Sequence, residues 1–475
     1  MVNTPPALSW TPQQAAHLLN RAGFGGTPDE IAQLHKLGHA GAVETLLGAV
    51  DESDLFSPPP LTSAAEIIAY QAESKRLAGD PLAKREVQKK FQRQQAEEVR
   101  ALRDWWLQRC RYTPFPLREK MTLFWHGHFA TSFDKVNSSF LVWQQNETLR
   151  AHALGSFREM TEEVARDPAM MRYLDLARSE KGKPNENFAR ELMELFMLGE
   201  GVRYTEKDIQ EAARALTGYR IDPKTLQYVF AKRRFDNSTK VFLGKTGNFE
   251  GSDIINIICE QPECADFMVR KIWDFLAGSP IPPALAGRLA AAYRKSDYNT
   301  STLLREIFLA PDFYTAAVMR RQVKSPVQWI VQTSRVLDAP LCPAGVNEQA
   351  MRSMGQLLFA PPNVKGWEGG QTWINSSTFL LRCNLAGEMV HGRNQKSGGN
   401  KMEALDIPWE RIAPIALRAD PPRLVDELSF RFLNAPLASD DRERFIAFIR
   451  QHGTDDASMK DLVHLFLSTP EYQLT

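Results

Sequence analysis

The chain has 475 residues, of which 43% are hydrophobic and 24% charged, and its 58 basic and 57 acidic residues leave a formal charge of +1. This apolar content excludes disorder over the whole length, and roughly 100–200 residues per domain allows two to four domains. A near-zero net charge provides no basic surface for nucleic acid, so no such partner is predicted. We expect a globular, mainly α-helical protein.

Cysteine usage and targeting signals add further exclusions. Five scattered cysteines without a CxxC spacing argue against a disulfide framework, a zinc ribbon or a thioredoxin-like site, and we expect buried free thiols. No apolar run reaches the roughly 18 residues of a transmembrane helix. The N-terminus has neither the basic start nor the apolar segment of a signal peptide. The default expectation is a cytoplasmic protein, and export as the passenger of a partner to the periplasm is the alternative.

Helix-start signals organise the N-terminal part. Thr11 and Thr27 each precede a proline, and Glu30 stands three residues after Thr27 as in a capping box. A proline-rich loop is expected over 51–62. The charged stretch 64–110, broken at a Gly-Asp-Pro sequence, predicts a solvated pair of helices, because opposite charges recur at helical spacing.

The middle of the chain is helical with one β segment. Helices are expected over 117–130 and 157–175, and two more begin at Pro184 and Thr205. Within 219–245, the β-rich runs TLQYVF and KVFLG flank a polar turn and predict one small hairpin.

The C-terminal half contains an internal repeat. Residues 264–314 resemble residues 423–473, with matching aromatic-leucine pairs at offsets that differ by one residue. Two similar helical modules are therefore expected. A surface loop is expected over 395–401, before the second module. We divide the chain into an N-terminal domain, 1–250, and a C-terminal region, 251–475.

The first half of the main candidate site lies in the segment LREKMTLFWHGHFA. Glu119 and His126 are seven residues apart and share a helix face, and His128 follows after Gly127. Two residues along a helix correspond to a turn of about 200°, so the two imidazoles converge on one ion only if the helix ends at Gly127.

The second half of this site is a polar stripe in the segment PNENFARELMELF. Asn187, Arg190, Glu191 and Glu194 have helical spacing on one face, and the other face is apolar. Ionisable groups on an apolar helix lower stability unless they are paired or bind a ligand.

Two imidazoles with carboxylates are a ligand set for zinc, iron or manganese. The predicted metal ligands are His126, His128, Glu191 and Glu194. In this hypothesis Glu119 orients His126, Arg190 holds a polar substrate group, and Glu194 is alternatively a catalytic base. An open coordination position would activate water or oxygen.

Two other interpretations of the same residues stay open. Glu119, Arg190, Glu191 and Glu194 form a buried ion-pair network, with both histidines bonded to backbone carbonyls, or they support acid–base chemistry without a metal. Neither HExxH nor the ferritin-like ExxH is present, so the spacing does not decide between them.

Further candidate residues lie at a helix start and in two loops. Asn185 and Asn187 bind a polar substrate at the free N–H groups of the helix, or Asn185 simply caps it. Lys365 and Trp367, in the Pro- and Gly-rich loop 360–382, bind substrate or plug the core. Asp236 and Lys240 in the hairpin turn contribute to a site or are solvated.

Several of these segments together resemble one family. The segments HLLNRAGFG, LREKMTLFWHGHFATS, NENFARELMELF, KVFLGKTGNFEG and PPNVKGW are similar to the bacterial Domain of Unknown Function 1800 family, over nearly the whole chain. The resemblance implies no established activity. Members are often encoded beside a sulfatase-like protein with an export signal, which implies a partner. Many have a histidine where this chain has Phe235, before Asp236.

Two functional hypotheses follow. The first is a metal-assisted hydrolase or oxidoreductase with a His/Glu site between apolar helices. The second is a non-catalytic helical partner or scaffold of the sulfatase-like protein.

Overall fold

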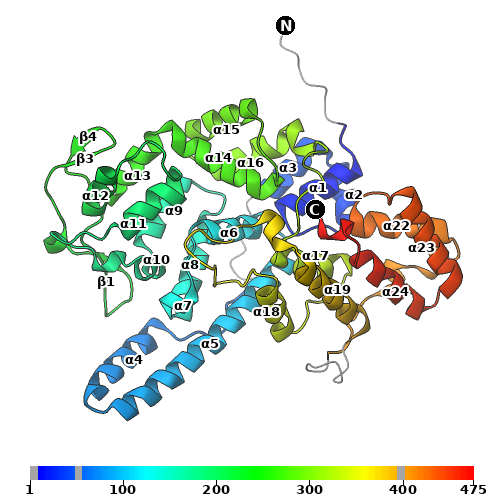
Figure 1. Ribbon diagram of the computed structural model, residues 1–475, viewed down its shortest axis with the longest axis horizontal. Coiled ribbons are helices and arrows are strands. Elements are labelled where there is room, and N and C mark those ends of the chain that lie inside the picture. Colours follow the sequence, from blue (N-terminus) through cyan, green and yellow to red (C-terminus); the bar gives the residue numbers. More distant parts are fainter. Residues whose placement is uncertain (1–8, 49–55, 393–401) are drawn as a thin grey trace, which may run out of the picture.

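The computed structural model describes residues 9–48, 56–392 and 402–475 and confirms a mainly α-helical protein (Figure 1). The predicted loop 395–401 and the first residues of the loop 51–62 lie outside these ranges. No helix in the described part of the chain is long and apolar enough to cross a membrane.

The described residues form 24 α-helices and four short strands. The helices of the N-terminal half are α1 (Pro12–Ala22), α2 (Pro28–Lys36), α3 (Gly38–Leu47), α4 (Ala64–Arg76), α5 (Pro81–Tyr112), α6 (Pro116–His128), α7 (Phe133–Val136), α8 (Ser139–His152), α9 (Phe157–Arg166), α10 (Pro168–Tyr173), α11 (Glu186–Glu191) and α12 (Glu206–Ala215). Those of the C-terminal half are α13 (Gly251–Glu260), α14 (Pro262–Ala277), α15 (Pro283–Lys295), α16 (Thr300–Leu309), α17 (Pro326–Val336), α18 (Ala344–Ser353), α19 (Ser376–His391), α20 (Trp409–Ile412), α21 (Ile415–Arg418), α22 (Pro421–Leu433), α23 (Ser439–His452) and α24 (Asp456–Leu467). Short 3₁₀ turns and one π-helical turn, η3 (Leu192–Met197), complete the helical structure.

Three of the predicted helix starts are stabilised by local hydrogen bonds. Thr11, Thr27 and Thr205 each accept a hydrogen bond from the backbone N–H three residues on, and the side chain at that position bonds back to the threonine N–H. These capping boxes satisfy N–H groups that a helix leaves free at its start.

The β residues form two separate antiparallel pairs. Strand β1 (Tyr219–Ile221) pairs with β2 (Tyr228–Phe230), and β3 (Lys240–Phe242) pairs with β4 (Lys245–Gly247). The two predicted runs therefore each form a hairpin with a neighbour instead of with each other. Leu243 and Gly244 both have positive φ, as a two-residue hairpin turn requires, and this turn closes the second pair.

The two predicted modules share one order of elements. The first consists of α14, α15, α16 and the 3₁₀ turn η5 (Pro311–Tyr314), and the second of α22, α23, α24 and η8 (Glu471–Gln473). The first helix of each ends at a left-handed residue, Gly278 or Asn434. Helix α1 contacts both modules, because Arg21 donates to the Leu276 carbonyl at 2.9 Å and Asn20 to the Asn434 side chain at 3.0 Å.

Helices α4 and α5 project from the body as an antiparallel arm (Figure 1). Tyr70 and Phe91 stack between them, with ring centroids 3.8 Å apart. At the base, buried Glu98 accepts hydrogen bonds from Thr62 and from Ser139 of α8, which fix the arm to the body. The rest of the arm is mostly exposed and charged, as the sequence predicts.

Most of the buried apolar side chains of both halves belong to one cluster. Helix α13, which opens the proposed C-terminal region 251–475, packs on α9 and α12 of the proposed domain 1–250. The division of the chain near residue 250 stays a prediction.

Candidate functional site

The segment NENFARELMELF leads into the π-helical turn η3, which directly follows α11 and ends at Met197. Single π turns inside helices are rare and recur at functional sites. At the end of η3, the N–H groups of Leu198 and Gly199 both bond to the Met193 carbonyl. The carbonyls of Leu195 and Phe196 instead accept hydrogen bonds from side chains of two other helices.

A pocket of about 380 Å³ lies against this turn. It is lined by His128, Glu194, Leu195, Gly199, Glu200, Phe267, Lys271, Val364 and Lys365. Three of these, His128, Glu194 and Lys365, are predicted site residues from separate segments, and the fold places them around one cavity. Pockets of this size hold small molecules.

His128 is buried at the end of α6 in a cage of aromatic rings that includes Phe129 and Phe196. Its Nε2 lies 3.0 Å from the Phe196 carbonyl oxygen. A carbonyl only accepts, so Nε2 carries the proton and Nδ1 carries a lone pair. Nδ1 has no hydrogen-bond partner among the described residues. Burial, together with the charge of Lys271, lowers the pKa of His128 well below its usual value, so the ring is neutral.

Lys271, from α14, is the second ionisable group of the pocket. Its Nζ donates to the Leu195 carbonyl at 3.2 Å and lies 5.2 Å from the centre of the Phe267 ring. Burial lowers the pKa of Lys271 to about 8. The amine is therefore mainly protonated at neutral pH but loses its proton more easily than an exposed lysine.

The acidic stripe of α11 and η3 lies at the edge of the pocket. Glu194 forms an ion pair with Arg190 at 3.4 Å, and Arg190 also contacts Glu206 at 2.8 Å and Glu186 at 3.3 Å. Arg190 is thus occupied by three carboxylates, which leaves little of it for a substrate. Burial and the neighbouring charge of Glu194 raise the pKa of half-buried Glu191.

The other side of the pocket is closed by Val364 and Lys365 of the predicted loop 360–382, which in the structure ends where α19 begins at Ser376. Lys365 is exposed and pairs with Glu200 at 2.6 Å across the rim of the pocket. Trp367 is half-buried, with its ring centroid 5.6 Å from that of His126. Gly366 has a φ of +81°, and a Cβ there would overlap the carbonyl oxygen of Gly127, so only glycine fits this approach of loop to helix.

Glu119 belongs to a buried ion-pair network and does not orient His126 directly. Its carboxylate accepts hydrogen bonds from Trp106 at 2.8 Å, Arg109 at 3.1 Å and Arg150 at 2.7 Å. Burial raises the pKa of Glu119, but the two guanidinium groups outweigh it and the net shift is downward. The Trp106 ring, which donates to Glu119, also contacts His126 edge-on.

The four predicted metal ligands are not arranged around one point. His126 Nε2 accepts the Phe359 N–H at 3.2 Å, so that lone pair is used. His128 sits one residue past Gly127 inside the same helix, which continues to His128 and sends the two rings apart. The described residues contain no group of three or more His, Cys, Asp or Glu side chains placed to hold a metal ion. The donor set therefore does not fit a shared ion, and no step is derived through one.

Asn185 acts as the N-cap of α11. Its side chain accepts the Asn187 N–H at 2.9 Å and donates to the Asp175 carbonyl at 3.4 Å. Asn187 is exposed, and neither asparagine is among the residues that line the pocket.

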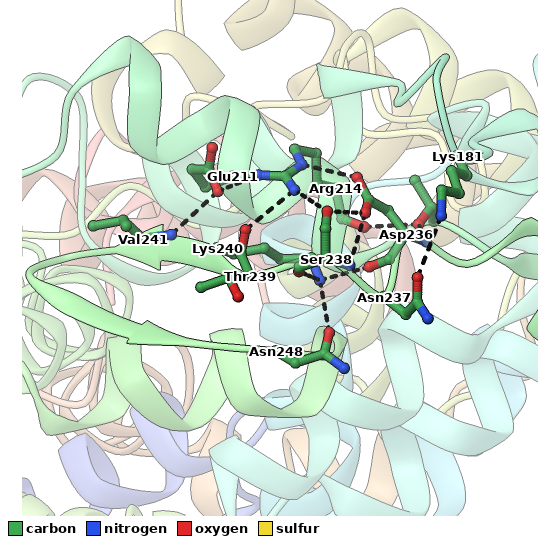
Figure 2. Close-up of polar contacts among 11 residues, drawn as sticks. Lys181, Glu211, Arg214, Asp236, Asn237, Ser238, Thr239, Lys240, Val241 and Asn248 are labelled. Carbon is green, nitrogen blue, oxygen red and sulfur yellow. Dashed lines mark hydrogen bonds and ion pairs between the residues drawn. The ribbon is translucent and has the colours of Figure 1, made fainter.

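Asp236 and Lys240 form a separate buried cluster between α12 and β3 (Figure 2). Arg214 donates to Asp236 at 2.9 Å, and Lys240 donates to the Asp236 carbonyl at 2.6 Å and to Asn248 at 3.3 Å. The Lys240 ammonium also lies 4.8 Å from the centre of the Phe235 ring. Phe235 thus packs on this cluster and is not among the residues that line the pocket.

Lys271 and Glu200 are the two ionisable residues of the pocket that the sequence analysis does not predict. Lys271 lies in the apolar helix segment CADFMVRKIWDFL, where a lysine followed by an aspartate three residues on is consistent with an exposed stripe. Lys271 is not part of any recognisable sequence motif. It is identified as a pocket residue only by the packing of α14 against η3.

Comparison with protein-family models gives one result. The model described as "Protein of unknown function (DUF1800)" matches residues 17–474. No curated protein and no solved structure matches the chain. The match includes the second half of α1, all the later helices, both β pairs and every residue of the pocket, and the chain belongs to the DUF1800 family of proteins of unknown function.

Proposed function

We propose that the protein is an enzyme, a hydrolase that uses acid–base chemistry in the pocket between α6, η3 and α14 to cleave a small polar substrate. The observation that carries the proposal is the fixed tautomer of His128, which presents an Nδ1 lone pair without a hydrogen-bond partner among the described residues, beside a lysine amine. A buried polar atom without a hydrogen-bond partner lowers the stability of the fold unless a ligand or a water molecule forms that hydrogen bond.

In this proposal His128 Nδ1 accepts a proton from the attacking water. The Lys271 ammonium donates a hydrogen bond to the oxygen on which negative charge develops, and Glu194 accepts a hydrogen bond from a donor group of the substrate. The Phe196 and Leu195 carbonyls hold the two nitrogen groups in place, so the geometry is prepared before the substrate binds.

The metal-assisted hydrolase or oxidoreductase is the other form of the enzyme hypothesis. It requires His126, His128, Glu191 and Glu194 to converge on zinc, iron or manganese. The hydrogen bonds of both histidines favour the metal-free form.

The experiment compares hydrolysis of p-nitrophenyl acetate and p-nitrophenyl phosphate by the wild type and by His128→Gln and Lys271→Met. A positioned base or oxyanion donor contributes about 100-fold or more, so each variant should lose at least that factor in kcat/KM. Lys245→Met is the matched control, because Lys245 is exposed and lies outside the pocket. Variants that hydrolyse the substrates as fast as the wild type would refute the assignment.

The role as a helical partner or scaffold of a sulfatase-like protein is the second candidate. The exposed, charged arm of α4 and α5 favours it, since the arm projects from the body without contributing to the pocket (Figure 1). Deletion of residues 66–94 removes most of the arm and should abolish co-purification with the neighbouring gene product. Substitutions in the pocket, such as His128→Gln, should leave this co-purification unchanged. Location in the cytoplasm, or in the periplasm by passenger export, is part of this proposal.

A further inference from the structure

The rim of the pocket between α6, η3 and α14 carries an excess of negative charge. Glu194 and Glu200 both line the pocket, together with Lys365. Lys365 is paired with Glu200 at 2.6 Å, so these two charges neutralise each other. Glu191 lies three residues before Glu194, and burial together with the charge of Glu194 raises its pKa. The carboxylates on this side of the pocket therefore lack a matching number of cations.

Glu194 has acceptor capacity left for a ligand. Arg190 lies 3.4 Å from one Glu194 oxygen, but it donates from both Nη atoms to Glu206, at 2.9 and 2.8 Å. The closer, two-pronged pair of Arg190 is thus with Glu206, and Glu194 is only weakly neutralised. A carboxylate accepts about four hydrogen bonds, and the Glu194 side chain is 26% exposed, so a cation in the pocket can bind to it.

The rest of the pocket restricts the molecule that carries this cation. His128 is 3% exposed, and its Nδ1 has no hydrogen-bond partner among the described residues, which points independently to a ligand. Leu195, Phe267 and Val364 form an apolar part of the wall. The volume of about 380 Å³ is near the lower end of the range for small-molecule sites, so the ligand is small.

We propose that the substrate carries a protonated amine next to the carbonyl group that is attacked, as in an amino acid with a free α-amine and an amidated or esterified carboxyl group. This inference rests on the proposed hydrolase function. Glu194 accepts hydrogen bonds from the ammonium group, Lys271 donates to the carbonyl oxygen, and the apolar wall contacts a small aliphatic side chain.

The reaction balances with water as the only co-reactant. Water attacks the carbonyl carbon and gives one proton to His128 Nδ1. The bond from this carbon to the leaving nitrogen or oxygen breaks, and His128 returns the proton to the leaving group. One water and one amide or ester thus give one carboxylic acid and one amine or alcohol.

The first test is binding, which does not depend on hydrolysis. Isothermal titration calorimetry at pH 7 compares L-alaninamide, whose amine is mainly protonated, with N-acetyl-L-alaninamide, which has no basic amine. A hydrogen bond to a charged group changes an affinity about 10- to 100-fold, so L-alaninamide should bind more tightly by that factor. Equal affinities, tighter binding of the acetylated probe, or no binding of L-alaninamide at millimolar concentrations would overturn the proposal.

The variant Glu194→Gln locates the interaction. The preference for L-alaninamide should fall about tenfold or more, because glutamine carries no charge. Glu162→Gln is the matched control and should keep the preference. Glu162 also pairs with an arginine at 3.4 Å, its side chain is 18% exposed, and it is not among the residues that line the pocket. An unchanged preference in folded Glu194→Gln would contradict the assignment. If this variant does not fold, the comparison of the two probes on the wild type still decides whether the pocket selects an amine.

Hydrolysis separates this inference from the proposed function. The rates of p-nitroaniline release are compared for L-alanine p-nitroanilide and N-acetyl-L-alanine p-nitroanilide. Faster hydrolysis of the free amine supports both proposals, whereas equal hydrolysis contradicts the amine preference and leaves the hydrolase. Tight binding of L-alaninamide without hydrolysis of any of these substrates supports the amine site and contradicts the hydrolase.

Discussion

Replacement of Glu119 by glutamine tests the account of the buried ion-pair network. Glu119 is fully buried, and its two oxygens accept hydrogen bonds from Arg109, Arg150 and Trp106. Removing the carboxylate takes one counter-charge from each of two buried guanidinium groups. A buried pair that loses one partner typically loses about 3–5 kcal/mol of stability.

The structure supplies a matched control on the same arginine. Glu147 also pairs with Arg150, but its side chain is 39% exposed. An exposed ion pair contributes at most about 1 kcal/mol, so Glu147→Gln should have a small effect. Urea unfolding at pH 7, followed by tryptophan fluorescence, measures both variants. With an unfolding entropy of about 2.1 cal/mol/K per residue, the Glu119 variant should also melt about 3–5 °C lower.

The dependence on pH gives a second signature. The pKa of Glu119 is lowered in the folded state, so its contribution is present above the unfolded pKa of about 4.3 and is lost as the pH falls through the folded pKa. The difference between wild type and Glu119→Gln should stay constant from about pH 5 to 8 and shrink below about pH 4. If Glu119→Gln is no more destabilising than Glu147→Gln, the network does not carry the stability assigned to it.

Three further predictions concern the loop, the pocket and the core. Gly366→Ala should destabilise the protein by at least about 1–2 kcal/mol, because Gly366 has a φ of +81° and a Cβ there would overlap Gly127. Gly345 has open space around it, so Gly345→Ala should not destabilise the protein. Thermal melting compares the two variants. If the pocket is catalytic, the rate should fall above about pH 8 as Lys271 loses its proton, and Lys271→Arg should move that fall to higher pH; an unchanged pH profile would contradict the role of Lys271. Burial lowers the pKa of Lys120 to about 7, so the unfolded chain binds the proton more tightly and stability should rise between about pH 7 and 10.5, by up to about 5 kcal/mol. Urea unfolding of Lys120→Met should show a flatter dependence on pH.

The proposed site joins a rare helical turn to two side chains that it orients. The π turn η3 leaves the Leu195 and Phe196 carbonyls to Lys271 and His128 instead of to its own backbone. A chain without this turn would satisfy those carbonyls within the helix and would leave both side chains without fixed partners. Glu119 and Arg190, by contrast, are held mainly by opposite charges, so their variants should change stability before they change chemistry.

The sequence by itself determined the features that depend on neighbouring residues. Capping boxes at Thr11, Thr27 and Thr205 mark helix starts because the threonine and the residue three positions on satisfy each other's backbone groups locally. The mainly α-helical class follows from the helical periodicity of the sequence, and the two similar modules follow from the resemblance of 264–314 to 423–473. Neither prediction requires knowledge of a long-range contact.

Only the tertiary structure decided which groups meet. Each β run pairs with its nearest neighbour because the residues between them are bound in the Asp236 cluster. Glu119 finds its arginines on α5 and α8, and His128 meets Lys271 from α14 at the end of the π turn. Hydrogen bonds and ion pairs between distant segments depend on how the helices pack, and the periodicity of one helix contains no information about the side chains that the next helix presents to it.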